Sequence, residues 1–364
     1  MSRGITLYLH VHQPWRVRRY SIFDVAARHD YFEANDPAQN NELIFHKVAE
    51  KSYLRMNALL EELLRRHHDF KLSLSISGVF LEQAERFNPA VIESFKRLVA
   101  TGKVELVSSP YYHSLAFFYS RDEFQRQVDI HRQKIRDLFG VETTTFRNTE
   151  LSYNNELAQW ADSQGYKGII AEGWDKVLGW RNANYTYVDW VDASMGHGGE
   201  IINLFMDFET FGENIWADTG IFEFFADFVE RWLGRYNHTF YTISGACQAL
   251  EPYDEIDCPQ TTTWADTERD LSAWLGNDMQ HEAMRDLYAM ERDVLDSGDI
   301  GLIADWRQLT TSDHPYYMCT KYFNDGDVHA YFSPYDSPYD AFLYFMNALR
   351  DIRYRLHEHN IAGY

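Results

Sequence analysis

Short apolar runs alternate with helical stretches along most of the chain, and this alternation restricts the possible folds more than any other feature. The runs show the alternating or β-branched pattern of strands and lie at residues 5–12, 71–78, 103–110, 143–150, 167–174, 201–207 and 238–244. Helical periodicity or helix-start signals fill the intervals, at about 47–66, 89–102, 120–139, 156–163 and 221–233. Strand–helix alternation of this kind predicts a parallel sheet covered by helices.

Reactive side chains collect where these runs end rather than where they begin. The first run ends in His10 and His12, and later runs end in Glu150 and Asp207. Because the carboxyl ends of barrel strands meet at one face, the pattern predicts an α/β fold, an incomplete TIM-type (β/α)7 barrel with its site at that face. A doubly wound open sheet is the alternative, but residues 13–15 show no glycine-rich phosphate loop after the first strand.

The pattern changes near residue 262. Beyond it, helical spacing continues through about 279–295 and again from Ser337 onward. We therefore expect a catalytic barrel over residues 1–262 and a C-terminal α-helical bundle over residues 263–364 that completes the substrate cleft.

The composition limits the classes of partner that the chain is expected to bind. The net charge of −21 argues against nucleic acid and anionic membrane surfaces, since phosphate binding needs a basic surface. Aromatic residues make up 16% of the chain, which suits a cleft that stacks flat rings or sugar faces. The three scattered cysteines and the absence of a leader-like or membrane-spanning apolar run predict a cytoplasmic protein.

Three carboxylates follow the apolar run at 201–204 within seven residues, namely Asp207, Glu209 and Glu213. Asp207 and Glu209 are two apart, so on an extended chain they point to the same side. A solvated strand end or helix N-caps would account for them without function. A general acid or a set of metal ligands in a cleft is the alternative.

A His-x-His pair at the end of the first strand also begins the metal site of amidohydrolase-type barrels. Here the later strand ends supply carboxylates but no histidine, and His113 and His197 lie in loops. We therefore favour hydrogen-bonded or substrate-binding roles for His10 and His12, and we expect no metal and no cofactor.

Paired carboxylates remain as the chemistry that the spacing supports. Glycoside cleavage needs one carboxylate at the anomeric carbon and a second acid to protonate the leaving oxygen. Glu150 and Asp207 fit these two roles, because neighbouring acids push their pKa values apart. The spacing also allows an ion pair between Glu150 and Arg147, or a helix N-cap at Asp207.

Five ordered blocks resemble glycoside hydrolase family 57, an α-amylase-type group. They are HQP at 12–14, GKVELVSSPYYH at 102–113, FRNTELSY at 146–153, FMDFETFGE at 205–213, and WAD at 264–266 with SAWLGN at 272–277. The segment LTTSDHPYYM at 309–318 is similar to the α-amylase-like branch of that family.

The resemblance implies a (β/α)7 barrel followed by a helical bundle, and a retaining mechanism on α-glucans. Matched by position, Glu150 is the expected nucleophile and Asp207 the expected general acid/base. We expect substrate contacts from His10, His12, Glu105, Trp174, Glu209, Phe211, Trp274, Asp313 and His314.

The predicted activity is cleavage of α-1,4-glucosidic bonds in an α-glucan or maltooligosaccharide. If a sugar hydroxyl replaces water as the acceptor, the same residues predict a 4-α-glucanotransferase or a branching enzyme. Two further hypotheses are an α-glucan-binding protein without activity, and a metal-dependent hydrolase built on His10 and His12.

Overall fold

The computed structural model describes residues 3–172, 200–252, 254–321 and 328–362 of the chain. In these ranges the strands are β1 (Arg3–Val11), β2 (Leu72–Ile76), β3 (Val104–Leu106), β4 (Thr145–Arg147), β5 (Gly168–Ile170), β6 (Ile201–Asp207) and β7 (His238–Tyr241). Each lies within or beside one of the strand-like runs of the sequence. Trp174, one of the expected substrate-binding residues, lies outside the described residues.

Strand β1 is the centre of the sheet, and the pairings among the seven strands of the described ranges are parallel. It pairs with β6, β2 and β7, and β3 joins β2 on the far side. Strands β4 and β5 form a separate pair, which a bridge between Ser108 and Phe146 connects to the end of β3. The register sets His10 beside Asp207, so the carboxyl ends of β1 and β6 meet.

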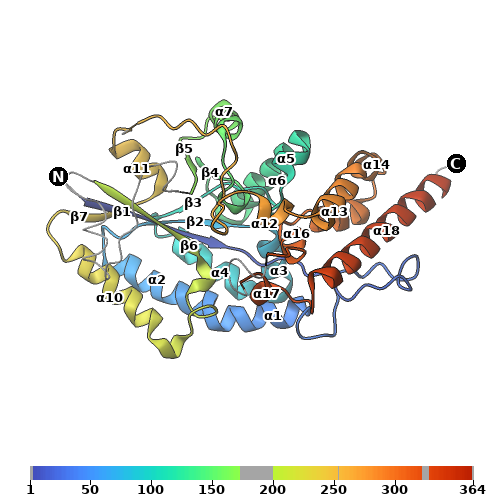
Figure 1. Ribbon diagram of the computed structural model, residues 1–364. Coiled ribbons are helices and arrows are strands. Elements are labelled where there is room, and N and C mark those ends of the chain that lie inside the picture. The colour runs from blue at the N-terminus through green and yellow to red at the C-terminus, as the bar shows by residue number, and fades with distance from the viewer. Residues whose placement is uncertain (1–2, 173–199, 253, 322–327, 363–364) are drawn as a thin grey trace.

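Helices cover both sides of these strands, as Figure 1 shows. They are α1 (Asn41–Val48), α2 (Leu54–Arg66), α3 (Gly78–Phe87), α4 (Pro89–Val99), α5 (Ala116–Tyr119), α6 (Arg121–Phe139), α7 (Asn155–Ser163), α10 (Ile221–Leu233) and α11 (Ile243–Ala249). Two start signals in the sequence act as expected, whereas Asn88, expected to cap α4, makes no capping hydrogen bond through its side chain. Ser120 caps α6 by accepting a hydrogen bond from the Glu123 amide, and Pro89 occupies the first position of α4.

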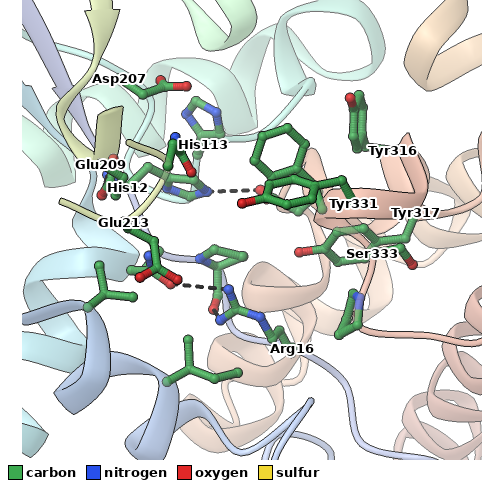
Figure 2. A pocket seen from close by; sticks show the side chains of 18 of the residues that line it. His12, Arg16, His113, Asp207, Glu209, Glu213, Tyr316, Tyr317, Tyr331 and Ser333 are labelled. Atoms are coloured by element: carbon green, nitrogen blue, oxygen red, sulfur yellow. Dashed lines mark hydrogen bonds and ion pairs between the residues drawn. The ribbon is translucent and has the colours of Figure 1, made fainter. Parts of the chain in front are cut away.

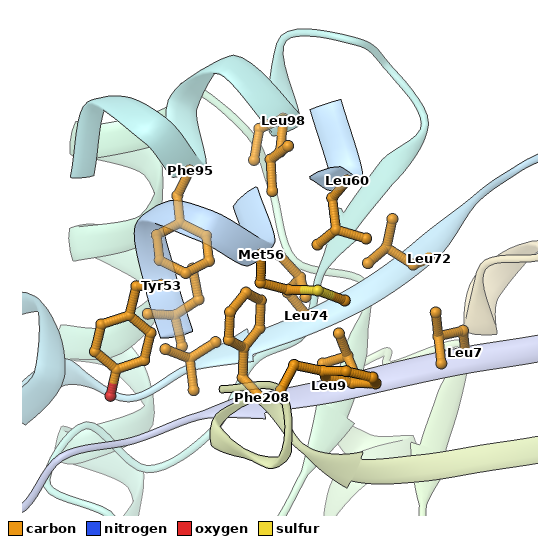
Figure 3. Close-up of a cluster of buried hydrophobic side chains, with 14 of the residues drawn as sticks. Leu7, Leu9, Tyr53, Met56, Leu60, Leu72, Leu74, Phe95, Leu98 and Phe208 are labelled. Carbon is orange, nitrogen blue, oxygen red and sulfur yellow. The ribbon is translucent and has the colours of Figure 1, made fainter. Parts of the chain in front are cut away.

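Apolar side chains of β1 and β2 pack against α2 and α4, and this cluster holds the strand that carries His10 (Figure 3). Leu9 and Leu74 are fully buried, as are Met56 and Phe95 on the covering helices. Each such side chain contributes roughly 1.5–3 kcal/mol by leaving water. The cluster therefore fixes where the carboxyl ends of β1 and β2 lie.

A second core forms among the C-terminal helices, which gather at one end of the molecule in Figure 1. They are α12 (Ser272–Leu275), α13 (Asp278–Ala289), α14 (Glu291–Asp296), α15 (Ile300–Leu309), α16 (Asp313–Tyr317), α17 (Val328–Phe332) and α18 (Pro338–Ala362). Trp15 and Tyr31, from the loop after β1, pack into the same core. The boundary expected near residue 262 stays a prediction, because the two parts of the chain share this core. No helix in the described ranges is both long and apolar enough to cross a membrane.

Candidate active site

A cleft of about 770 Å³ opens between the carboxyl ends of the strands and the C-terminal helices. Figure 2 shows tyrosines of the C-terminal helices on one side of it and His12, His113, Glu209 and Asp207 on the other. Seven of the residues expected from the sequence line this cleft, namely His10, His12, Glu150, Asp207, Glu209, Trp274 and Asp313.

Glu150 follows β4 in a short 3-10 turn, η2 (Thr149–Leu151), with an unusual backbone. Its φ is 58° and that of Leu151 is 51°, so two successive residues with side chains adopt the left-handed region. Such positions cost of order 1–3 kcal/mol each and persist only where the surroundings impose them. The turn directs the Glu150 side chain into the cleft instead of continuing the strand.

The Glu150 carboxylate accepts hydrogen bonds from three separate parts of the chain. Oε1 accepts from His113 Nε2 at 2.9 Å and from Ser312 Oγ at 3.0 Å. Oε2 accepts from Trp264 Nε1 at 2.9 Å. A carboxylate with this many donors is fixed in orientation and stabilised in its charged form.

Asp207 is the last residue of β6 and is only partly accessible. The 3-10 turn η3 (Phe208–Thr210) begins immediately after it, but the Asp207 side chain makes no capping hydrogen bond to that turn. The helix-cap explanation of Asp207 is therefore not supported, and its carboxyl group remains available in the cleft.

The two carboxyl groups have pKa values shifted in opposite directions. Burial raises the pKa of Glu150, but the hydrogen bond from His113 and the charge of Arg147 outweigh burial and bring this pKa below its usual range. Burial and the negative charge of Glu150 raise the pKa of Asp207 to about 6. One group is therefore ionised and the other holds a proton in weakly acidic solution.

Glu209, the third acid of the cleft, is buried against the helix layer. Its Oε1 accepts from Tyr53 Oη at 2.6 Å and from the His12 amide at 3.4 Å. Tyr53 ends a π-helical segment, η1 (Ala49–Tyr53), between α1 and α2, a local widening that is frequent at functional sites. Burial and the charge of Asp207 raise the pKa of Glu209 to about 8, so at neutral pH it is a protonated acid that can donate.

Three histidine rings lie against one another beside the carboxylates. The ring centroid of His113 lies 4.1 Å from that of His12 and 4.9 Å from that of His10. Burial lowers the pKa of His113 to about 4, and Arg147 Nη1 donates to its Nδ1 at 3.4 Å. His113 is therefore neutral with its proton on Nε2, where it donates to Glu150.

The ring nitrogens of His10, His12 and His113 come within 4.8 Å of one another, a spacing that could hold a metal ion. Most of them already have partners, however. His12 binds Ser77 Oγ through Nδ1 and Asp313 Oδ2 through Nε2, and both nitrogens of His113 are engaged. Only His10 Nε2 has no partner among the described residues. The donor set therefore fits hydrogen-bonded imidazoles better than a metal site.

Arg147 is fully buried under this group and does not form the ion pair with Glu150 that the sequence allowed. Its guanidinium lies 5.4 Å from the centre of the Trp264 ring. Nε and Nη2 have no hydrogen-bond partner in the described part of the chain. Its charge acts at short range on both candidate catalytic carboxyls.

Three of the expected substrate-binding residues do not line the cleft. Glu105 turns toward the sheet, where it accepts from Ser73 Oγ and Thr145 Oγ1, both at 2.9 Å. Phe211 is buried in the barrel core, with its ring 5.0 Å from that of Phe225. His314 is buried too; its Nε2 lies 3.2 Å from the Gln308 carbonyl oxygen.

Conversely, the three donors to Glu150 were not among the expected site residues. Trp264 and Ser312 lie inside family-like sequence blocks, which was the one signal available for them. His113 lies in a loop, as expected, but its approach to the histidine pair was not predicted. The loop after β3 brings its ring against both His10 and His12.

Comparison with known proteins shows which family the chain belongs to. The family model described as glycosyl hydrolase family 57 matches residues 6–192. A protein of Methanocaldococcus jannaschii named "Putative alpha-amylase" is 36% identical over 97% of this chain and 85% of its own length. The chain belongs to glycosyl hydrolase family 57.

Solved structures support the same fold at low sequence identity. A 4-α-glucanotransferase from Thermococcus litoralis is similar with a TM-score of 0.65 and 12% identity over 86% of this chain, which spans 56% of that protein. A GH57-type branching enzyme from Pyrococcus horikoshii has a TM-score of 0.64 and 14% identity over 87% of this chain and 86% of its own. The predicted incomplete TIM-type barrel of family 57 is therefore confirmed.

Proposed function

We propose that this family 57 member cleaves α-1,4-glucosidic bonds of α-glucans by double displacement. The observation that carries the proposal is the pairing of Glu150 and Asp207 in one cleft, where three donors hold the Glu150 carboxylate. The raised pKa of Asp207, about 6, lets this second group carry a proton in weakly acidic solution. A retaining glycosidase needs one ionised carboxylate as the nucleophile and one protonated carboxyl group as the general acid.

In the first step, a Glu150 oxygen attacks the anomeric carbon while the bond from that carbon to the leaving oxygen breaks. Asp207 gives its proton to the departing sugar. In the second step, Asp207 takes a proton from the acceptor hydroxyl, whose oxygen attacks the same carbon and releases Glu150. Protonated Glu209 and the His12–Asp313 pair line the cleft as candidates to bind sugar hydroxyls.

The acceptor decides the product. Water gives an α-amylase, and this proposal is supported by the name of the relative with 36% identity. Transfer to a second sugar is the other candidate, because Tyr316 and Tyr331 line the wall opposite the carboxyls and offer rings to an acceptor chain.

Product analysis of a maltoheptaose digest tests the proposal, with Glu150→Gln and Asp207→Asn beside the wild type. We expect shorter products for hydrolysis, or both longer and shorter ones for transfer, and a loss of about a thousandfold or more in each variant. Binding of maltoheptaose without turnover by the wild type would indicate a glucan-binding protein. Loss of activity with a chelator, restored by a divalent metal, would favour the metal-dependent hypothesis.

A further inference from the structure

Two aromatic side chains of α17 stand exposed on the wall of the cleft. Tyr331 is 66% exposed and Phe332 is 48% exposed, whereas Trp274 on the same cleft is only 2% exposed. The two rings lie 5.0 Å apart and are nearly perpendicular, at 86°. Large apolar rings left open in a concave site commonly mark a place where a ligand covers them.

A buried polar contact fastens the helix that carries these rings. His329, two residues before Tyr331, is almost fully buried, and its Nε2 lies 3.1 Å from Asp266 Oδ1. Its ring centroid is 4.5 Å from that of Tyr316. Asp266 Oδ2 also meets Lys321 Nζ at 3.4 Å. The short helix is therefore anchored to the cleft wall, and its exposed rings have a defined position.

The pair and the candidate catalytic carboxyls line the same cleft from opposite sides. In Figure 2, Tyr331 comes from the C-terminal helices and lies across from His12 and Glu209. An apolar pair on open surface would suit a protein partner. A pair that lines the cleft holding Glu150 and Asp207 suits a substrate that extends beyond these two residues.

We propose that Tyr331 and Phe332 form an outer saccharide platform that binds distal glucose units of an α-glucan whose reacting bond lies at Glu150 and Asp207. The apolar face of a pyranose ring packs on an aromatic ring while its hydroxyls remain solvated, and exposed rings at a cleft edge provide that surface. This inference rests on the proposed function, and it predicts that longer α-glucans bind more tightly because of the two rings of α17.

Calorimetric titration with maltoheptaose and maltotetraose tests the platform in a Glu150→Gln background, where turnover does not interfere. We expect the Tyr331→Ala/Phe332→Ala pair to raise the Kd for maltoheptaose about tenfold, with a much smaller change for maltotetraose. A Tyr331→Trp/Phe332→Trp pair keeps the rings and should restore most of the affinity.

A Phe23→Ala/Tyr236→Ala pair is the matched control, because both rings are about as exposed as a side chain can be and neither lines the cleft. It should leave both Kd values unchanged. If the α17 alanine pair binds maltoheptaose as tightly as its parent does, or weakens both oligosaccharides equally, the platform is refuted and the proposed function stands. If the parent itself binds neither oligosaccharide and the wild type cleaves no α-glucan, the proposed function and the platform fall together.

Discussion

His113 Nε2 lies 2.9 Å from Glu150 Oε1, and the two residues come from different βα loops of the barrel. Arg147 donates to the other ring nitrogen of His113, which fixes the tautomer that points a proton at the carboxylate. The expected nucleophile is thus oriented by a neutral imidazole that is itself oriented by a buried cation. Each of these contacts leads to a measurable expectation.

Replacing His113 by alanine should lower kcat by roughly 10- to 100-fold, since a hydrogen bond to a charged group is worth about 1.5–3 kcal/mol. Without this donor the pKa of Glu150 rises. Because Glu150 must be ionised to attack, the acid limb of the pH–rate profile should move to higher pH. His113→Gln offers an amide donor in the same region and should recover part of the loss. An unchanged acid limb in His113→Ala would contradict the role assigned to this histidine.

Trp264→Phe keeps an aromatic ring but removes the Nε1 donor to Glu150 Oε2. We expect a fall in kcat of roughly ten- to a hundredfold with little loss of thermal stability. Trp160→Phe is the matched control, because Trp160 is also half-buried and donates to Gln125 at 2.9 Å, away from the cleft. Equal kinetic losses in the two variants would show that the Trp264 bond has no special part in the reaction.

Arg147→Met should displace the whole pH–rate profile toward alkaline pH. Asp207 must be protonated for the first step, so wild-type activity should fall as pH rises through its pKa of about 6. The charge of Arg147 lowers the pKa of both Asp207 and Glu150. Removing this charge raises both pKa values, so the acid limb and the alkaline limb of the profile both move to higher pH. Arg147→Lys keeps the charge and should move the two limbs much less. If Arg147→Met lowers the maximum rate without moving either limb, an electrostatic role for Arg147 is contradicted.

Glu209→Gln tests whether Glu209 works as a neutral acid. Because the pKa of Glu209 is raised to about 8, the amide imitates the form present at neutral pH. We expect kcat/KM at pH 6 to stay within about tenfold of wild type, whereas Glu150→Gln loses about a thousandfold or more. A collapse of Glu209→Gln to the level of Glu150→Gln would mean that the site uses ionised Glu209.

The barrel was predictable because each of its strands is marked by residues that are adjacent in the sequence. Each strand is a short apolar run, and parallel strands bring their carboxyl ends to one face whatever the details of packing. The same rule predicted that reactive side chains from several strand ends would gather at one face, and the strand register places His10 beside Asp207 there.

The carboxylate's donors were not predictable because they converge over long sequence separations. Trp264 lies 114 residues from Glu150, and Ser312 lies 162 residues from it. Position relative to the cleft was hard to predict for the same reason. Asp313 lines the cleft, while His314, the next residue on α16, turns instead toward Phe345. Sequence spacing gives the face of an element but not what covers that face.

The most direct test of the account is to trap the covalent intermediate that assigns the nucleophile. The protein is incubated with a 5-fluoro-α-glucosyl fluoride, whose leaving group needs no acid, and is then digested and mapped by mass spectrometry. We expect one added fluoroglucosyl group on the peptide that carries Glu150, retained in Asp207→Asn and absent in Glu150→Gln. Labelling of Asp207 or Glu209, or turnover of the reagent through Glu150→Gln at the wild-type rate, would contradict it.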